Sequence, residues 1–448
     1  MERYALEELL QFVEEHRFRS LRTRLAEMNE ADIAEFMEEL DDNRKVLIFR
    51  MLPKELAADV FACLETDIQE HIINSITDAE IHKIVEDLFV DDAVDMLEEL
   101  PATVVKRVMR NTTPETRQII NQFLQYPDNS AGSIMTAEYI GLKKYMNVEQ
   151  AFSYIRAHGV DKETIYTCFV MDGGRHLEGV VTIKDLLMNP YETKIQDIMD
   201  TNIIKTVTTE DQEEVIELFN KYDLLCLPVV DHEERLVGIV TVDDIVDVME
   251  EEATEDFEKM AAMLPSDKPY LKTSILELAK NRIVWLTVLM LSSMITGSIL
   301  THYEEAFAAL PLLVSFVPML TGTGGNAGSQ SSTMIIRCMA IGEVEPKDVL
   351  RVIWKEVRVA LLVGLILGAL NYVRLMLMYP GQPVVCLTVV LSLYITVIMA
   401  KSIGCTLPIA AKLLNLDPAI MAAPLISTIV DACSLIIYFR IACNLLHI

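Results

Sequence analysis

The stretch PLISTIVDACSLIIYF, residues 424–439, carries one carboxylate, Asp431, in a run that is otherwise apolar enough to lie in lipid. Four more apolar runs precede it, and the predicted spans cover residues 283–301, 306–335, 357–379, 384–411 and 418–445. Each can cross a hydrocarbon layer of ~30 Å, which takes about 20 helical residues. Five such runs favour a membrane domain of five helices over residues 281–448, rather than the core of a soluble protein.

The charges divide the chain into two parts of different kinds. Residues 1–265 hold 25 Lys and Arg against 57 Asp and Glu, a net charge of −32, whereas the remainder holds 13 against 10, a net charge of +3. An acidic half repels nucleic acid, whose phosphates need Lys and Arg, and it suits divalent cations instead. The eight cysteines form no CxxC pair, which indicates free thiols in a reducing compartment.

Residues 1–130 are predicted to form an all-α domain. Apolar residues recur at helical spacing, as in AVDMLEEL at 93–100. A loose echo links FRMLPKEL at 49–56 with LEELPATV at 97–104, 48 residues further on. Such a repeat predicts helical hairpins stacked into a small solenoid.

Residues 131–250 contain a second repeat, with predicted modules at 131–195 and 196–250. Each module opens with Ile-Met and closes on a matching stretch, LEGVVTIKDLL at 177–187 and LVGIVTVDDIV at 236–246. The pattern between them gives the order β-α-β-β-α, which fits an α/β tandem pair of CBS modules. The glycine of each stretch is expected to allow a tight turn into the strand. Asp185 and Asp243 are expected to cap the helices that follow.

Residues 247–280 predict a long acidic helix, a break containing proline and a second helix that leads into the membrane. The orientation follows from basic residues near the spans. They gather before span 1, between spans 2 and 3 and between spans 4 and 5: Lys268, Lys272, Lys280, Arg282, Arg337, Lys347, Arg351, Lys355, Arg358, Lys401 and Lys412. These regions and the acidic half are therefore expected on the cytoplasmic side of the cell membrane, and the C-terminus outside.

Asp431 is the only acidic residue that the sequence places well inside a span, and spans 1 to 4 offer it no basic partner at mid-depth. An Asp at the centre of a membrane helix costs about 2.5–3.5 kcal/mol to insert, and such a residue usually faces a wet path. Span 2 is unusual as well, because PMLTGTGGNAGSQSSTM (318–334) interrupts it with glycines and neutral polar side chains. This composition is typical of a wet cavity, although close helix packing would also explain the glycines.

A path with one carboxylate and many neutral oxygens suits a small, hard cation. Mg²⁺ gives up water reluctantly, so a carboxylate can hold it through its bound waters. The sequence offers no cluster of His, Cys or Met, the softer ligands that favour Cu or Zn. One carboxylate per chain is little charge for a dication, and a twofold dimer would supply two copies of Asp431 around a central axis.

Four motifs resemble the MgtE family of magnesium channels, in the right order and over essentially the whole chain. They are YPDNSAGSIMT (126–136), DVMEEEATEDF (247–257), PMLTGTGGNAGSQ (318–330) and PLISTIVD (424–431). The resemblance implies a homodimer in the lipid bilayer, with a pore formed between the subunits by spans 2 and 5. It also implies Mg²⁺ uptake down the electrochemical gradient. The helical domain, the CBS pair and a connecting plug helix within 247–280 would close the pore when cytoplasmic Mg²⁺ is high.

The same resemblance implies roles for individual residues. Asp431 would be the pore aspartate, and the pore-lining residues of span 2 would be Gly322, Gly325, Asn326 and Gln330. The acids that bind regulatory Mg²⁺ would be Asp91, Asp95, Asp223, Asp244, Asp247, Glu255, Asp256 and Asp417. Residue spacing agrees in part, because Asp91 and Asp95 share one helical face, where like charges destabilise a helix unless a cation lies between them. Without the resemblance, each set would fit a solvated helix face better.

CBS pairs often bind adenine nucleotides, and ATP would tune the Mg²⁺ response in this family. Thr182 and Asp185 are placed to hold a ribose, since a carboxylate can accept protons from both hydroxyl groups. Lys184 could face phosphate, and Tyr166 is a candidate for stacking on the adenine.

Other classes of function remain open. An ion-coupled secondary transporter of divalent cations, in which Asp431 titrates, is the main alternative. A CBS-regulated anion channel is disfavoured by the carboxylate at mid-membrane and by the lack of a basic pore ring. A membrane-anchored sensor would leave the polar span 2 without a purpose. The sequence shows no Ser/His or Cys/His set that indicates an enzyme, and it leaves selectivity among Mg²⁺, Mn²⁺, Co²⁺ and Ca²⁺ open.

Overall fold

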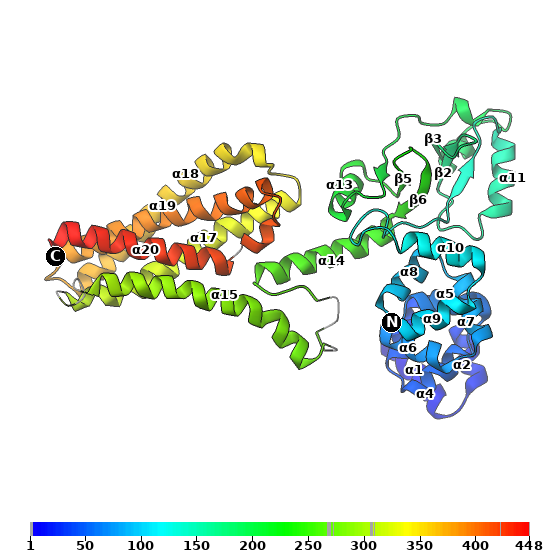
Figure 1. Ribbon diagram of the computed structural model, residues 1–448, viewed down its shortest axis with the longest axis horizontal. Helices are drawn as coiled ribbons and strands as arrows, with labels where there is room; N and C mark the ends of the chain where they lie inside the picture. Colours follow the sequence, from blue (N-terminus) through cyan, green and yellow to red (C-terminus); the bar gives the residue numbers. More distant parts are fainter. Residues whose placement is uncertain are drawn as a thin grey trace. The chain divides into compact units, whose positions relative to one another are not determined.

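The structure is a computed structural model that describes residues 3–266, 270–271, 273–304, 308, 310–421 and 423–447. The chain divides into two compact units, Met1–Val248 and Met249–Ile448, and each is considered by itself (Figure 1). Lys268 and Lys272, which contribute to the predicted orientation, lie outside the described residues.

The first unit begins with a helical domain. Its helices are Arg3–Glu14 (α1), Phe18–Leu25 (α2), Glu30–Glu38 (α3), Asp42–Phe49 (α4), Lys54–Ala62 (α5), Thr66–Ser75 (α6), Asp78–Asp87 (α7), Val90–Glu99 (α8), Ala102–Asn111 (α9) and Pro114–Phe123 (α10). From α3 to α10 each helix packs on the helix two places further along the chain, which confirms the predicted solenoid. The 48-residue echo marks equivalent helix starts, because Pro53 and Pro101 are the N-cap residues of α5 and α9.

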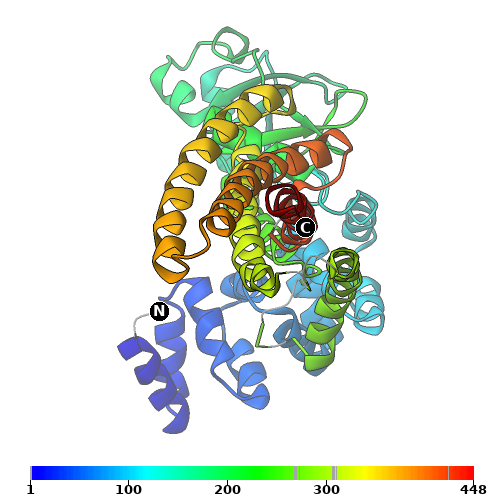
Figure 2. The same ribbon diagram turned by 90° about the vertical axis from the view of Figure 1, so that its left-hand side faces the viewer.

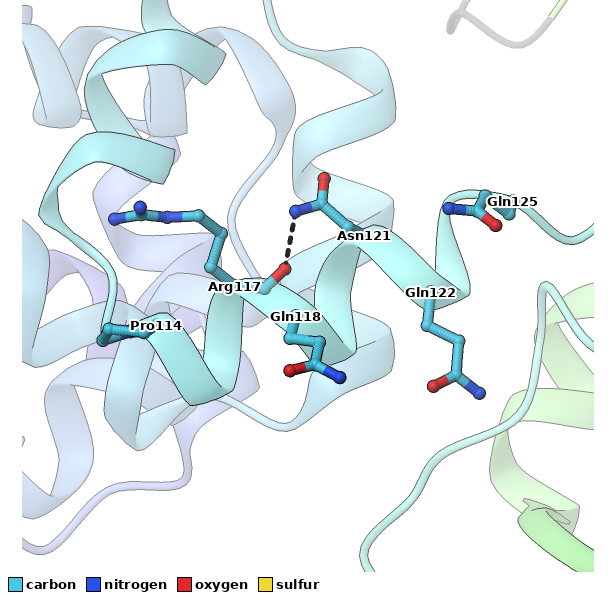
Figure 3. A pocket seen from close by; sticks show the side chains of 6 residues that line it. All are labelled: Pro114, Arg117, Gln118, Asn121, Gln122 and Gln125. Carbon is cyan, nitrogen blue, oxygen red and sulfur yellow. Dashed lines mark hydrogen bonds between the residues drawn. The ribbon is translucent and has the colours of Figure 1, made fainter.

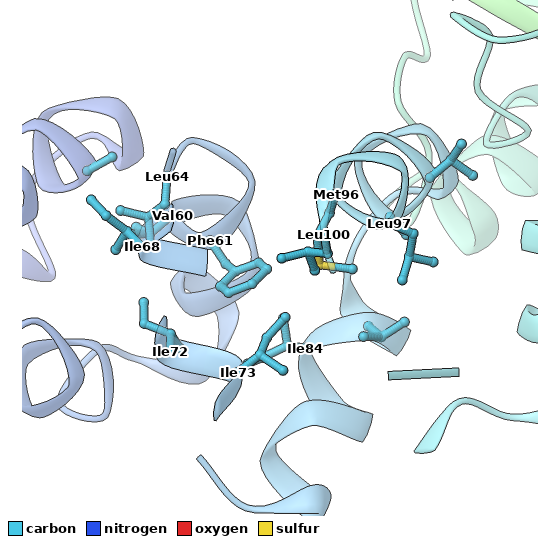
Figure 4. Packing of buried hydrophobic residues seen from close by; sticks show 14 of the residues in the cluster. Val60, Phe61, Leu64, Ile68, Ile72, Ile73, Ile84, Met96, Leu97 and Leu100 are labelled. Carbon is cyan, nitrogen blue, oxygen red and sulfur yellow. The ribbon is translucent and has the colours of Figure 1, made fainter. Parts of the chain in front are cut away.

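A continuous apolar core holds this helical domain together. Figure 4 shows Phe61, Ile73 and Ile84 directed into the space between the helices, and all three side chains are buried. Burying side chains of this size stabilises a fold by about 1.5–3 kcal/mol each. The core therefore gives α8 a rigid support, which matters because α8 carries two of the predicted Mg²⁺-binding acids.

The rest of the first unit has the predicted β-α-β-β-α order twice. The first module contains Ile140–Leu142 (β1), Val148–His158 (α11), Thr167–Met171 (β2), Leu177–Thr182 (β3), Ile183–Met188 (α12) and the short 3₁₀ helix Ile195–Asp197 (η1). The second contains Thr206–Val207 (β4), Gln212–Tyr222 (α13), Cys226–Val230 (β5), Leu236–Thr241 (β6) and Val242–Met260 (α14). In both sheets the middle strand pairs in parallel with the first strand and antiparallel with the third.

The two CBS modules exchange a packing contact, because a methionine from each packs on a strand of the other. A Cβ at Gly179 in β3 would lie 2.6 Å from the sulfur of Met199, and a Cβ at Gly238 in β6 would lie 2.6 Å from the sulfur of Met135. The Ile-Met pair that opens one module thus packs on the third strand of the other. The expectation that these glycines serve a tight turn is wrong, because both lie within strands, where they make room for a methionine.

The helix caps of the two modules also differ from the prediction at one position. Asp185 accepts hydrogen bonds at Oδ2 from the backbone N–H and the hydroxyl group of Thr182, at 2.9 and 2.5 Å. In the second module Asp244, not Asp243, accepts the equivalent bonds from Thr241. The matching stretches align Asp185 with Asp244, so the prediction was displaced by one residue. This cap begins α14, a single helix that runs through the predicted limit between the CBS pair and the plug helix.

The second unit is built of long helices. They are Ile275–His302 (α15), Val317–Ala340 (α17), Val349–Met378 (α18), Pro383–Leu413 (α19) and Ala423–Leu446 (α20), with 3₁₀ turns at Pro311–Phe316 (η2), Pro346–Asp348 (η3) and Pro418–Met421 (η4). In the described part of the chain, four segments are long and apolar enough to span a membrane: Ile275–His302, Pro346–Met378, Pro383–Leu413 and Pro418–Leu446. Helix α17 has sufficient length, at 24 residues, but its polar side chains and glycines lower its hydropathy.

Helix α17 begins later than the predicted span 306–335. The segment before it forms η2, and Pro311 and Pro318 each stand in the first turn of their helix, where a missing N–H does no harm. Figures 1 and 2 show α17, α19 and α20 side by side, and each of these helices packs on the other two.

Candidate metal sites

Asp431 is half-buried on α20. Within the described residues it has no hydrogen bond and no ion pair. Its neighbour Val430 and Ser434, one turn further on, pack on α17, because a Cβ at Gly324 would lie 2.9 and 3.0 Å from their side chains. The carboxylate therefore lies at the level of the glycine motif, with its charge uncompensated by the rest of the described chain.

Helix α17 has two faces of different character. Gly324, Gly325 and Gly328 are buried, and a Cβ at Gly325 would come within 3.2 Å of the Ser427 hydroxyl group on α20. The predicted pore-lining residues Gly322, Asn326 and Gln330 are exposed, and their spacing of four residues places them on one side of the helix. The motif thus serves close packing on one side and presents amide groups on the other, which leaves Gly325 away from the exposed side.

The membrane helices contain a second acidic residue and a buried base, contrary to the prediction. Lys401 is 6% exposed within α19, and its Nζ lies 3.6 Å from Oε2 of Glu356 on α18. Glu356 lies two turns inside α18, because this helix begins at Val349 and not near residue 357. One charged residue lowers the mean hydropathy of a long apolar run only slightly. The hydropathy of the sequence therefore did not reveal this ion pair. Among the described residues, the carboxylate partner of Lys401 is Glu356, and no ion pair joins Lys401 to Asp431.

In the first unit, an acidic cluster forms around Asp91 of α8. Its Oδ1 atom is buried and has no hydrogen-bond partner among the described residues. Burial raises the pKa of Asp91 well above its usual value, and the nearby Asp92, Asp244, Glu163 and Glu138 raise it further. A buried, unpartnered oxygen surrounded by like charges is a position that a cation would stabilise.

Three members of this cluster, Asp92, Glu138 and Glu163, were missed by sequence reasoning. Burial, and next the charge of Asp244, raise the pKa of Asp92 to about 6 and that of Glu163 to about 7. Burial also raises the pKa of Asp244, against the opposing effect of its Thr241 hydrogen bond. Glu163 lies in a loop between α11 and β2, so only the folded chain brings it to α8 and α14.

The remaining predicted acids of the first unit are exposed. Asp95 follows Asp91 by one helical turn. The negative charge of Asp247 contributes to the raised pKa of Asp244. Asp223 ends α13 in the left-handed conformation, with φ of 50°. In the described part of the chain, no three His, Cys, Asp or Glu side chains are close enough to hold a bare metal ion. Mg²⁺ that keeps its waters needs only one or two carboxylates directly, so the cluster fits a hydrated ion.

The second unit contains the other predicted acids, at the end of α14. The Nζ of Lys259 lies 2.7 Å from both Glu255 and Asp417, the residue that precedes η4. Burial raises the pKa of the adjacent Asp256 to about 6, with Asp417 as the next cause. The structure thus brings Glu255, Asp256 and Asp417 close together, and it places near them an ammonium group that the sequence did not indicate.

The predicted nucleotide residues are adjacent in space. The N–H of Ile183 donates to the carbonyl oxygen of Tyr166 at 3.0 Å, which brings the exposed Tyr166 to the start of α12, beside Thr182, Lys184 and Asp185. Two cavities are described elsewhere in the first unit. One of about 450 Å³ runs along α10 between Pro114 and Gln125, and Figure 3 shows its lining. The other, of about 490 Å³, lies at the turns that connect β2 to β3 and β5 to β6.

Comparisons with known proteins cover nearly all of the chain. Family models match for an MgtE divalent cation transporter at residues 317–441, for an MgtE intracellular N domain at 28–129, and for CBS domains at 131–191 and 195–251. The chain is 36% identical over 433 residues to the magnesium transporter MgtE of Thermus thermophilus, with 96% of each covered. It is 31% identical over 432 residues to the magnesium transporter MgtE of Bacillus subtilis, with 96% of this chain and 95% of that protein covered.

Two solved structures resemble the soluble half of this chain, by which we mean the helical domain and the CBS pair. The cytosolic domain of the Mg²⁺ channel MgtE in complex with ATP is 34% identical, with a TM-score of 0.52, and the match covers 54% of this chain and 99% of that one. The soluble part of a magnesium transporter is 29% identical, with a TM-score of 0.53, and covers 55% and 98%.

Proposed function

Because the chain belongs to the MgtE family of divalent cation transporters, we propose that it is a channel that carries Mg²⁺ into the cell down its electrochemical gradient. The observation that carries this proposal is Asp431, a half-buried carboxylate on a membrane helix without a partner in the described residues. Such a charge is retained in a membrane where a cation compensates it. The waters bound to a hydrated Mg²⁺ ion can donate hydrogen bonds to carboxylate oxygens, and the ion can leave without losing those waters.

The channel is a homodimer in this proposal. Asn326 and Gln330 are exposed in the single chain, and amide groups facing lipid would be costly. A second copy would cover this face of α17 and bring a second Asp431 to a shared axis, which gives the path twice the negative charge. The soluble half then lies in the cytoplasm. Because the number of spans, five, is odd, the C-terminus lies outside the cell.

Cytoplasmic Mg²⁺ closes the pore by binding to the acidic groups. The unpartnered Oδ1 of Asp91 supports a site on α8, shared with Asp95 and with Asp244 and Asp247 of α14. Glu255, Asp256 and Asp417 would form a second site near the pore mouth, with Asp223 as a further single ligand. When Mg²⁺ is scarce these acids repel one another and the plug region of α14 moves away.

ATP would tune this response from the first CBS module. Thr182 and Asp185 would hold the ribose, Lys184 the phosphates, and Tyr166 the adenine. Support comes from their proximity at the start of α12 and from the ATP complex of the related cytosolic domain.

The experiment is Mg²⁺ uptake by the purified chain in liposomes, measured with independently set Mg²⁺, proton and sodium gradients and a fixed membrane potential. We expect uptake that follows only the Mg²⁺ gradient and the potential, and that stops when millimolar Mg²⁺ faces the soluble half. Uptake that requires a proton or sodium gradient would instead identify a coupled transporter. No uptake under any gradient would refute transport.

A further inference from the structure

A buried polar network joins three membrane helices. The hydroxyl group of Ser331 on α17 donates to Oε2 of Glu356 on α18 at 2.6 Å. Oγ of Ser331 in turn accepts a hydrogen bond from Nζ of Lys401 on α19 at 3.1 Å. One hydroxyl group therefore bridges a carboxylate and an ammonium group, which are themselves 3.6 Å apart.

The burial of this network makes it sensitive to any change in the helix positions. Ser331 is 2% exposed, and the side chains of Lys401 and Glu356 are 7% and 17% exposed. A buried charge is tolerated when it is paired and hydrogen-bonded, and removal of one partner leaves the other uncompensated. The three residues therefore favour only those arrangements in which α17, α18 and α19 keep their present contacts.

Nearby glycines explain the closeness of α17 and α19 but not their rotation. A Cβ at Gly404 would overlap the carbonyl oxygen of Gly328, so the two backbones touch. Gly328 lies three residues before Ser331, and Gly404 three residues after Lys401. A contact between glycines has no side chains that interlock, whereas hydrogen bonds to Ser331 are directional. A rotation of α17 by one residue, about 100°, would carry Ser331 away from both partners.

We propose that Ser331, Glu356 and Lys401 form a positioning triad that fixes the rotation of α17 and so aims Asn326 and Gln330 at the path of the cation. The inference rests on the proposed function, because it assigns a purpose to the orientation of this helix. Gln330 directly precedes Ser331 and is exposed, while Ser331 is buried. Anchoring Ser331 on the packed side thus sets the direction of the amide groups on the other side.

The test measures Mg²⁺ and Ca²⁺ uptake over a range of concentrations, for the full chain in liposomes of one fixed lipid composition. Ser331→Ala keeps both charges and removes only the bridge. We expect it to change the Mg²⁺-to-Ca²⁺ uptake ratio, or the half-saturating Mg²⁺ concentration, about fivefold, as for the loss of one hydrogen bond. The double variant E356Q/K401M should have a larger effect. The exchanged pair E356K/K401E should restore part of the lost selectivity or affinity. Ser331 can still donate to the carboxylate, now on α19, and accept from the ammonium group, now on α18.

The matched control is Lys355→Met, which removes an exposed lysine on α18 next to Glu356 and should leave both quantities unchanged. Gel filtration in detergent checks that each variant is folded, and E356Q/K401M, which leaves no lone charge, carries the test if Ser331→Ala does not fold. Unchanged ratio and half-saturation in Ser331→Ala and E356Q/K401M would overturn the triad, even if maximal uptake falls. Absence of Mg²⁺ uptake by the wild-type protein would instead refute the proposed function.

Discussion

Lys259 allows a specific prediction about gating, because its ion pair with Asp417 holds the end of α14 against the segment before η4. Its ammonium group contacts Glu255 and Asp417, both at 2.7 Å, and the three side chains are 23–30% exposed. An ion pair of this partial exposure stabilises a structure by about 1 kcal/mol. Glu255 lies on α14 with Lys259, so only the pair with Asp417 is lost when α14 moves away. Lys259→Met would therefore cost the docked arrangement about 1 kcal/mol and leave Glu255, Asp256 and Asp417 to repel one another.

A loss of about 1 kcal/mol corresponds to a roughly fivefold change in an equilibrium between two states. In Mg²⁺-free solution, the ratio of open to closed channels should therefore rise about fivefold in Lys259→Met. In saturating Mg²⁺, the ion takes the position of the ammonium group, and the open fraction should return to the wild-type value.

The assay is single-channel recording, with the solution on the side of the soluble half exchanged from Mg²⁺-free to saturating Mg²⁺. Lys280→Met is the matched control, since it removes an exposed lysine near the start of α15. An unchanged open fraction of Lys259→Met in Mg²⁺-free solution would show that the ion pairs do not hold the closed state. A variant that stays open in saturating Mg²⁺ would show that Lys259 and not Mg²⁺ closes the pore.

Three further predictions concern the soluble half. Asp91→Asn should raise the free energy of unfolding in Mg²⁺-free solution by about 1–3 kcal/mol and reduce the stabilisation by Mg²⁺, because it removes a buried charge that lacks a partner; equal thermal shifts with Mg²⁺ in both proteins would contradict a site there. Since the pKa of Glu163 is raised to about 7 and that of Asp92 to about 6, the folded state binds protons that the unfolded chain has released, so Mg²⁺-free protein should lose stability as the pH rises from about 4.5 through 7. Mg²⁺ should flatten this thermal-unfolding profile, and a Mg²⁺-free profile that rises with pH would refute the cluster. Lys184→Ala should weaken ATP binding in calorimetry without altering the cap between Thr182 and Asp185, whereas unchanged affinity in Lys184→Ala and Asp185→Ala would remove the site.

The sequence predicted the order of the elements well, because their periodicities are local properties of the chain. The CBS repeat and the helical hairpins are both visible as matching stretches at fixed spacing. The swapped packing of Met135 and Met199 was not predictable, since the glycine that admits each methionine lies in the other module. The motif resemblance identified Glu255, Asp256 and Asp417, which the structure brings together, but not the lysine between them.

Residues that act in pairs across the fold were the ones missed. Lys401 and Glu356 look like isolated charges near span ends, and only the packing of α18 on α19 makes them partners. Glu163 and Asp92 likewise acquire their raised pKa values from burial and from Asp244, which is distant in sequence. Electrostatic coupling of this kind depends on tertiary distances that no spacing rule contains.

The most direct test of the account is Mg²⁺ flux through liposomes containing either the wild-type chain or Asp431→Asn, with the same protein density and the same Mg²⁺ gradient. The substitution keeps the size of the side chain and removes only its charge. If Asp431 holds the ion in the pore, Mg²⁺ flux should fall by an order of magnitude or more, roughly the effect of losing one strong charge interaction, and the preference over monovalent cations should be lost. Wild-type flux and wild-type selectivity in Asp431→Asn would contradict it.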